Sequence, residues 1–281
     1  MEPTAGEVLK LTTFERSDIK KERIMSTALF GSIIFGPIHS RRLGVSLGVN
    51  LLPATGKVCS FDCIYCECGY NAERRGGKIP SGDDVIAALE KSLQEMSESG
   101  HSLDVITFAG NGEPTLHPEF ARVIDATLVL RDRYYPQAKV SVLSNSTRID
   151  RPDVFAALQK VDNNILKLDS VFAETVALID APNQEGFSVD NLIANLKKFE
   201  GNLIIQTMFL RGNHNGQVVD NTTEREVEGW LKALQTIKPK QVMVYSLDRP
   251  TPEQNLQKVP KAELEQIANR ARALGFEVSV A

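Results

Sequence analysis

The placement of the cysteines constrains this chain more than any other sequence feature. All four lie in one short stretch, KVCSFDCIYCECG, at Cys59, Cys63, Cys66 and Cys68. The rest of the 281 residues contains none. The thiols therefore serve one local site, and such clustering in a chain of this length argues against a secreted disulfide framework.

The spacing of the first three cysteines, C-x3-C-x2-C, suits a loop that wraps three thiolates around one side of a 4Fe-4S cluster. Thiolate is the soft ligand that iron-sulfur chemistry requires. Three ligands leave one of the four irons open to a substrate or cofactor, as in catalytic zinc sites. Two alternatives stay open: a zinc site, and a closed site with Cys68 as fourth ligand. We expect Cys68 to be a small residue near the cluster or an oxidisable thiol.

Hydrophobic periodicity predicts an α/β fold, because apolar strand patterns alternate with amphipathic helical patterns. We expect strands over residues 45–51, 103–109, 140–143, 164–168, 203–209 and 242–246, with an edge strand over 277–280. We expect helices over residues 85–96, 118–133, 152–160, 173–179, 189–199, 224–237 and 261–274. Such alternation implies parallel pairing, with ligands bound beyond the carboxyl ends of the strands.

Composition bounds the remaining possibilities. The hydrophobic fraction of 42% is that of a globular protein, and the net charge of -4 gives no support to a broad nucleic-acid-binding face. The sequence shows neither a signal peptide nor an apolar run of the ~20 residues that a membrane helix needs. A cytoplasmic protein without a membrane partner is expected. Residues 1–32 are predicted to be a disordered extension or leader, residues 33–250 the core domain, and residues 251–281 a helix and edge strand packed on it.

Two motifs together match a known family. Cys59, Cys63 and Cys66, with Tyr65 before the third, match a CxxxCxΦC signature, and FAGNGEP over residues 108–114 looks like a GGEP-type loop. On these residues the chain resembles the radical S-adenosylmethionine (radical SAM) superfamily. The blocks GPIHSRRLGVSLGVNLLP and VYSLDRPTPE resemble its branch related to wyosine base formation. The resemblance implies an incomplete (β/α)6 TIM-like barrel of parallel strands, with the three cysteines as cluster ligands.

The resemblance also implies a reaction. A reduced 4Fe-4S cluster would cleave S-adenosylmethionine to a 5'-deoxyadenosyl radical, which abstracts hydrogen from a substrate, with a reductant such as flavodoxin or ferredoxin. No catalytic side chain beyond the cluster is expected. The substrate stays open between tRNA or another nucleotide, a peptide and a small metabolite. The alternative from another class is a non-catalytic iron-sulfur electron carrier or metal-binding protein.

The loop Gly110, Asn111, Gly112 and Glu113 carries the second motif. By match with the family it binds the amino group of S-adenosylmethionine. A tight turn that needs glycine for its backbone angles is the simpler interpretation, and both can hold together.

Further cofactor contacts are predicted at the ends of other strands. The resemblance places Ser144 and Asn145 near the ribose or the methionine carboxylate, and Tyr65 beside the adenine. Tyr245 is expected to complete that pocket, or to be an ordinary packed tyrosine. An asparagine in a turn is the alternative at Asn145.

Charged residues on the predicted barrel strands need partners, because burying an unpaired charge is costly. Lys167 and Asp169 either pair with each other structurally or face the cavity, as a cofactor contact for Lys167 and a substrate contact for Asp169. Asp248 and its neighbour Arg249 pose the same alternative, with Asp248 as a substrate contact.

Two further groups are assigned from their positions. Arg41 or Arg42 would bind an anionic substrate group through a bidentate guanidinium, with a solvated turn as the alternative. His117 and His214 are expected to be surface residues.

Overall fold

The computed structural model describes residues 29–40, 44–72 and 76–281. Its main sheet has eight strands in the order β1-β2-β3-β4-β5-β6-β9-β11. These are β1 Ile34–Ser40, β2 Gly44–Val49, β3 Val105–Phe108, β4 Lys139–Ser144, β5 Asn163–Lys167, β6 Ile204–Met208, β9 Gln241–Tyr245 and β11 Val278–Val280. β1 pairs antiparallel with β2, and the other neighbouring strands pair parallel.

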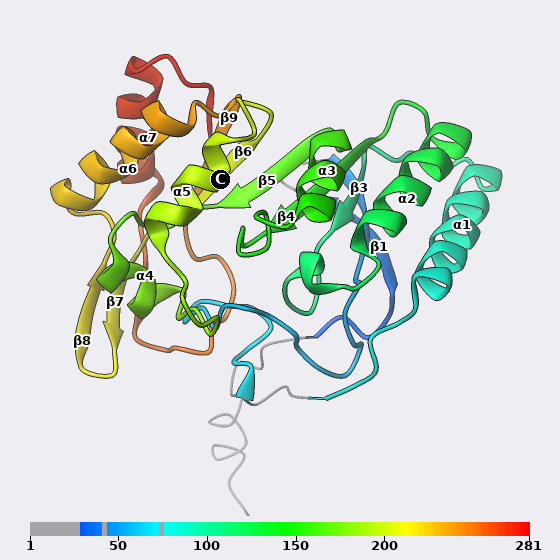
Figure 1. Ribbon diagram of the computed structural model, residues 1–281, viewed down its shortest axis with the longest axis horizontal. Helices are drawn as coiled ribbons and strands as arrows, with labels where there is room; N and C mark the ends of the chain where they lie inside the picture. Colours follow the sequence, from blue (N-terminus) through cyan, green and yellow to red (C-terminus); the bar gives the residue numbers. More distant parts are fainter. Residues whose placement is uncertain (1–28, 41–43, 73–75) are drawn as a thin grey trace, which may run out of the picture.

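Most of the helices cover the outer side of the curved sheet (Figure 1). They are α1 Gly82–Glu98, α2 Phe120–Tyr134, α3 Pro152–Lys160, α4 Ala173–Ile179, α5 Val189–Lys197, α6 Glu224–Ile237 and α7 Lys261–Ala273, with a short 3-10 turn at Pro114–Leu116. In Figure 1, α1, α2 and α3 lie along one end of the sheet, and α5, α6 and α7 lie along the other. This is the expected α/β class, an incomplete TIM-like barrel.

Local chemistry explains several of these elements. Strand β3 is VITF, three apolar residues and a threonine, and all four are buried, as expected of a strand covered on both faces. Helix α1 is capped at its N-terminus by Ser81. The Ser81 side chain accepts a hydrogen bond from the Asp84 amide, and the Asp84 carboxylate accepts one from the Ser81 amide. The indole of Trp230, on α6, packs edge-on against Phe209 at 5.4 Å and donates to Thr207 Oγ1 at 2.9 Å.

The six predicted parallel strands and the edge strand β11 are all present. Sequence reasoning missed two features. One is β1, which carries Pro37 on the edge of the sheet. The other is a separate antiparallel sheet of β10 Leu256–Lys258, β7 Leu210–His214 and β8 Gln217–Asp220. The β7–β8 hairpin projects away from the barrel in Figure 1.

The C-terminal segment is continuous with the core, because β11 extends the same sheet by parallel pairing with β9. At the other end, the backbone of Phe30 exchanges two hydrogen bonds with the Asn111 side chain, at 2.8 and 2.9 Å. We therefore propose that the core domain includes Phe30 at one end and residues 251–281 at the other. In the part of the chain that the structure describes, no helix has the length and apolarity to cross a bilayer.

Candidate functional site

The cysteine loop begins as a short extension of the sheet. The Val58 amide donates to Asn111 O at 3.0 Å, and the Glu113 amide donates to Val58 O at 3.0 Å. These bonds join the residue before Cys59 to the glycine-rich loop after β3. The two predicted motifs therefore meet directly at the carboxyl ends of β2 and β3.

A second anchor holds the middle of the loop against the C-terminal end of α4 and the residues that follow it. The amides of Asp62 and Ile64 donate to Asp180 O and Ile179 O at 2.9 and 3.0 Å. The side chain of Asn183 donates to Cys59 O at 2.9 Å. The loop is thus fixed on both sides by backbone groups that lie far away in sequence.

All four cysteines are free thiols. Burial raises the pKa of Cys59 to about 12 and raises that of Cys63, whereas a hydrogen bond with Cys68 lowers the pKa of Cys66 to about 6. The Cys68 thiol also lies 3.4 Å from Gly110 O. Thiolates bind metals, so loading a cluster here would release protons.

Lys57 is a residue of this site that sequence reasoning missed. Its side chain is 1% exposed, and its ammonium donates to Gly69 O at 2.6 Å and lies 3.4 Å from Asp62 Oδ1. Burial alone would lower its pKa, but the negative charges of the cysteines outweigh burial and the pKa is raised. In the sequence, only its position two residues before the first cysteine could have indicated that Lys57 belongs to the site.

The glycine-rich loop requires its glycines. Gly110 and Gly112 have φ of +155° and +130°, and a Cβ on Gly112 would lie 1.9 Å from Val58 O. Asn111 is fully buried, and its amide also donates to Pro53 O at 2.8 Å. The tight-turn interpretation is therefore correct, and the partly exposed glycine backbone is the part of the loop left to contact a ligand.

Glu113 organises the ends of two strands. It is 2% exposed, and its carboxylate accepts from Thr115 Oγ1 at 2.5 Å, Ser144 Oγ at 2.9 Å and the Asn145 amide at 2.6 Å. The Asn145 side chain continues this network to Ser60 Oγ at 2.9 Å, beside Cys59. Burial raises the pKa of Glu113, although these hydrogen bonds oppose the effect.

Lys167 and Asp169 pair structurally, the first of the two alternatives considered above. The Lys167 ammonium lies 2.7 Å from Asp169 Oδ2, 2.8 Å from Asp180 Oδ1 and 3.5 Å from Cys63 Sγ. It also contacts the Tyr65 hydroxyl, which hydrogen-bonds to Asp169. Burial would lower the pKa of Lys167, but the two carboxylates raise it well above its usual value. Burial raises the pKa of Asp180 to about 7, although Lys167 opposes this.

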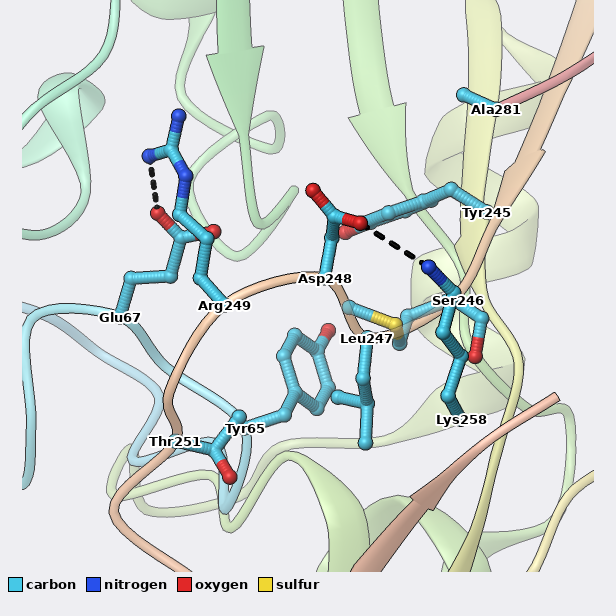
Figure 2. A pocket seen from close by; sticks show the side chains of 11 residues that line it. Tyr65, Glu67, Tyr245, Ser246, Leu247, Asp248, Arg249, Thr251, Lys258 and Ala281 are labelled. Atoms are coloured by element: carbon cyan, nitrogen blue, oxygen red, sulfur yellow. Dashed lines mark hydrogen bonds and ion pairs between the residues drawn. The ribbon is translucent and has the colours of Figure 1, made fainter. Parts of the chain in front are cut away.

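Tyr65 and Tyr245 line the same small cavity of about 60 Å³ (Figure 2). Figure 2 shows two ion pairs at its rim, Asp248 with Lys258 at 3.0 Å and Arg249 with Glu67 at 2.7 Å. The rim pairs are exposed, so Asp248 is near the cavity mouth and has a structural partner.

The remaining predicted residues have different outcomes. Arg41 and Arg42 lie outside the described residues. The prediction of a surface position was wrong for His117, which is 1% exposed and has its ring nitrogens 2.9 Å from Pro80 O and 3.1 Å from the Glu119 amide. His214 is half-buried and pairs with Glu253 at 2.8 Å, so it is not a free surface residue either.

The donor set fits an iron-sulfur cluster. Three cysteines of one anchored loop offer soft ligands, and a buried ammonium beside them offsets thiolate charge. Among residues 29–40, 44–72 and 76–281, no three His, Cys, Asp or Glu side chains are grouped to hold a single metal ion.

Comparison with known proteins decides the family. The profile described as "Radical SAM superfamily" matches residues 54–220, more than half of the chain. The chain belongs to the radical SAM superfamily. Membership makes it an enzyme that uses a 4Fe-4S cluster and S-adenosylmethionine, and leaves its particular reaction unassigned.

The individual relatives share about 30% sequence identity or less with this chain. A UPF0026 protein of Methanocaldococcus jannaschii is 30% identical over 240 residues, which cover 83% of this chain and 68% of that protein. The "GTPase Obg" of Brachyspira hyodysenteriae is 29% identical over 237 residues, 83% of this chain but only 32% of that protein. A radical SAM methyltransferase structure from Sphaerobacter thermophilus superposes with a TM-score of 0.61 at 16% identity, covering 84% of this chain and 65% of that one. That structural likeness supports the fold.

Proposed function

We propose that this chain reductively cleaves S-adenosylmethionine at a 4Fe-4S cluster held by Cys59, Cys63 and Cys66, and so abstracts hydrogen from a substrate. One observation carries the proposal: the three-cysteine loop and the glycine-rich loop are hydrogen-bonded side by side at the carboxyl ends of parallel strands. The bound cluster and cofactor would supply one-electron reductive chemistry.

The chain's own residues would hold the cofactor and shape its site. The partly exposed backbone of Gly110 and Gly112 offers acceptors for an ammonium group, and the Glu113 amide ties the end of this loop to Val58 O. Tyr65 and Tyr245 offer aromatic walls of the neighbouring cavity. We also propose Ser144, Asn145 and Lys167 as cofactor contacts. Ser144 and Asn145 hydrogen-bond to the buried Glu113. Lys167 pairs with the buried Asp169 and Asp180.

For the substrate, we propose a nucleic-acid base as the first class to test, because the blocks before the cluster and after β9 resemble the wyosine-related branch. Arg41, Arg42 and Asp248 are the residues proposed to recognise it, whereas Asp169 is buried and paired with Lys167. A peptide and a small metabolite are the competing classes. Binding to tRNA that falls steeply with salt supports the base, whereas affinity insensitive to ionic strength excludes a polyanion.

The decisive experiment is spectroscopic. Anaerobically prepared protein is reduced, and its cluster EPR signal is recorded with and without S-adenosylmethionine. We expect the cofactor to change the signal and 5'-deoxyadenosine to accumulate when a low-potential reductant such as flavodoxin is supplied. An unchanged signal without this product would instead support the electron-carrier alternative.

Cys68 provides the matched control, because it lies in the same loop and is buried like Cys63. Cys68→Ser should retain the cluster, whereas Cys63→Ser should lose it. Loss of the cluster in both variants would indicate a closed four-cysteine site and contradict the proposal.

A further inference from the structure

A buried charged group lies behind one of the three proposed cluster ligands. The Lys167 ammonium is 3.5 Å from Cys63 Sγ, and the Asp180 carboxylate is also 3.5 Å from that sulfur. Ammonium and carboxylate are 2.8 Å apart. One sulfur atom therefore has a positive and a negative group in direct contact.

The surroundings keep these charges out of water. Side-chain exposure is 14% for Lys167, 1% for Asp169 and 3% for Asp180. The centroid of the Tyr65 ring lies 4.4 Å from the ammonium, and this ring closes a further side. Low solvent access strengthens Coulomb interactions over these distances.

A cluster bound through Cys63 would sense both groups. Its one-electron reduction takes an electron from a low-potential donor, forms or breaks no covalent bond, and leaves one more negative charge on the cluster and its thiolates. A neighbouring ammonium stabilises that charge, and a neighbouring carboxylate opposes it. Hydrogen bonds to ligand sulfurs and local charge are the means by which proteins tune such potentials.

We propose that Lys167 and Asp180 are positioning residues that set the reduction potential of the cluster with opposite signs, acting through the Cys63 thiolate. Lys167 raises the potential and Asp180 lowers it. This inference rests on the proposed assignment of Cys63 as a ligand. It gives the buried lysine a function that is present before any S-adenosylmethionine binds.

The test is an EPR-monitored redox titration with dithionite and mediators, without S-adenosylmethionine, on protein of matched iron and sulfide content. Lys167→Met should disfavour reduction at least tenfold in the equilibrium constant, about 59 mV for one electron. Asp180→Asn should favour reduction by a similar factor. Lys167→Arg keeps the charge and should stay within about threefold of the wild type.

Glu226→Gln is the matched control, because Glu226 is a buried carboxylate whose partners are Ser170 and Thr175, and should leave the potential unchanged. Shifts of the same sign in Lys167→Met and Asp180→Asn, or shifts no larger than that of the control, overturn the inference. If Lys167→Met holds no cluster, Asp180→Asn against Glu226→Gln decides the question. A wild type without a 4Fe-4S signal would refute the proposed function itself.

Discussion

Replacing Gly112 by alanine tests whether the junction of the two loops builds the site. The new Cβ would lie 1.9 Å from Val58 O and 2.5 Å from Val58 C, both backbone atoms that cannot rotate away. The chain must separate there, which breaks the two hydrogen bonds at Val58, each worth about 1 kcal/mol. The φ of +130° adds about 1–3 kcal/mol for a non-glycine residue. We expect a total loss of about 3–5 kcal/mol.

Gly100→Ala separates this clash from backbone strain alone. Gly100 also has a positive φ, +71°, but its Cβ would have no atom within 4 Å. Its expected cost is about 1–2 kcal/mol. Urea unfolding of both variants, prepared identically under anaerobic conditions, measures the difference, and iron content reports the site. Equal stability of the two variants, with full iron content in Gly112→Ala, would refute the reasoning.

Three further predictions concern single side chains. Burial raises the pKa of Glu113, so its contribution to the unfolding free energy is complete below the unfolded pKa of about 4.3 and is lost as pH rises through the native pKa. Between the unfolded and the native pKa, the unfolding free energy should fall as pH rises. Glu113→Gln should remove this pH dependence, as measured by urea unfolding at several pH values. Trp230→Phe removes the indole bond to Thr207 and leaves a void, at a cost of about 2 kcal/mol in thermal or urea unfolding. Arg249→Ala breaks an exposed pair with Glu67 and should change stability by less than about 0.5 kcal/mol.

The barrel strands could be predicted because local pattern and tertiary environment agree. Strands such as β3 are short apolar runs bounded by turn residues, and both of their faces are buried. The hairpin strand β7 has no such pattern, since it includes Arg211 and Asn213. Its strand conformation depends on pairing with β8 and with residues 256–258, which sequence periodicity does not report.

The site was also predictable in part: its local motifs could be recognised, but contacts between distant residues could not. The cysteine and glycine motifs were visible because their spacing is local, and the barrel topology brought them together. Asp180 gave no signal, because it lies at the end of α4 and reaches Cys63 only through the fold. His117 appeared to be an isolated loop histidine, although its ring bonds join the loop before α2 to Pro80, just before α1.

The anchoring of the cysteine loop has a consequence for biogenesis. The cysteines are synthesised before Ile179 and Asp180, whose carbonyls accept hydrogen bonds from the cysteine loop, and before Glu253, whose amide donates to Ile64 O. The chain must therefore be synthesised as far as residue 253 before the cysteine loop can make all of these contacts. A ribosome-stalled fragment ending before residue 179 is therefore expected to lack the backbone contacts that hold the cysteine loop, and to bind iron less well than the full chain.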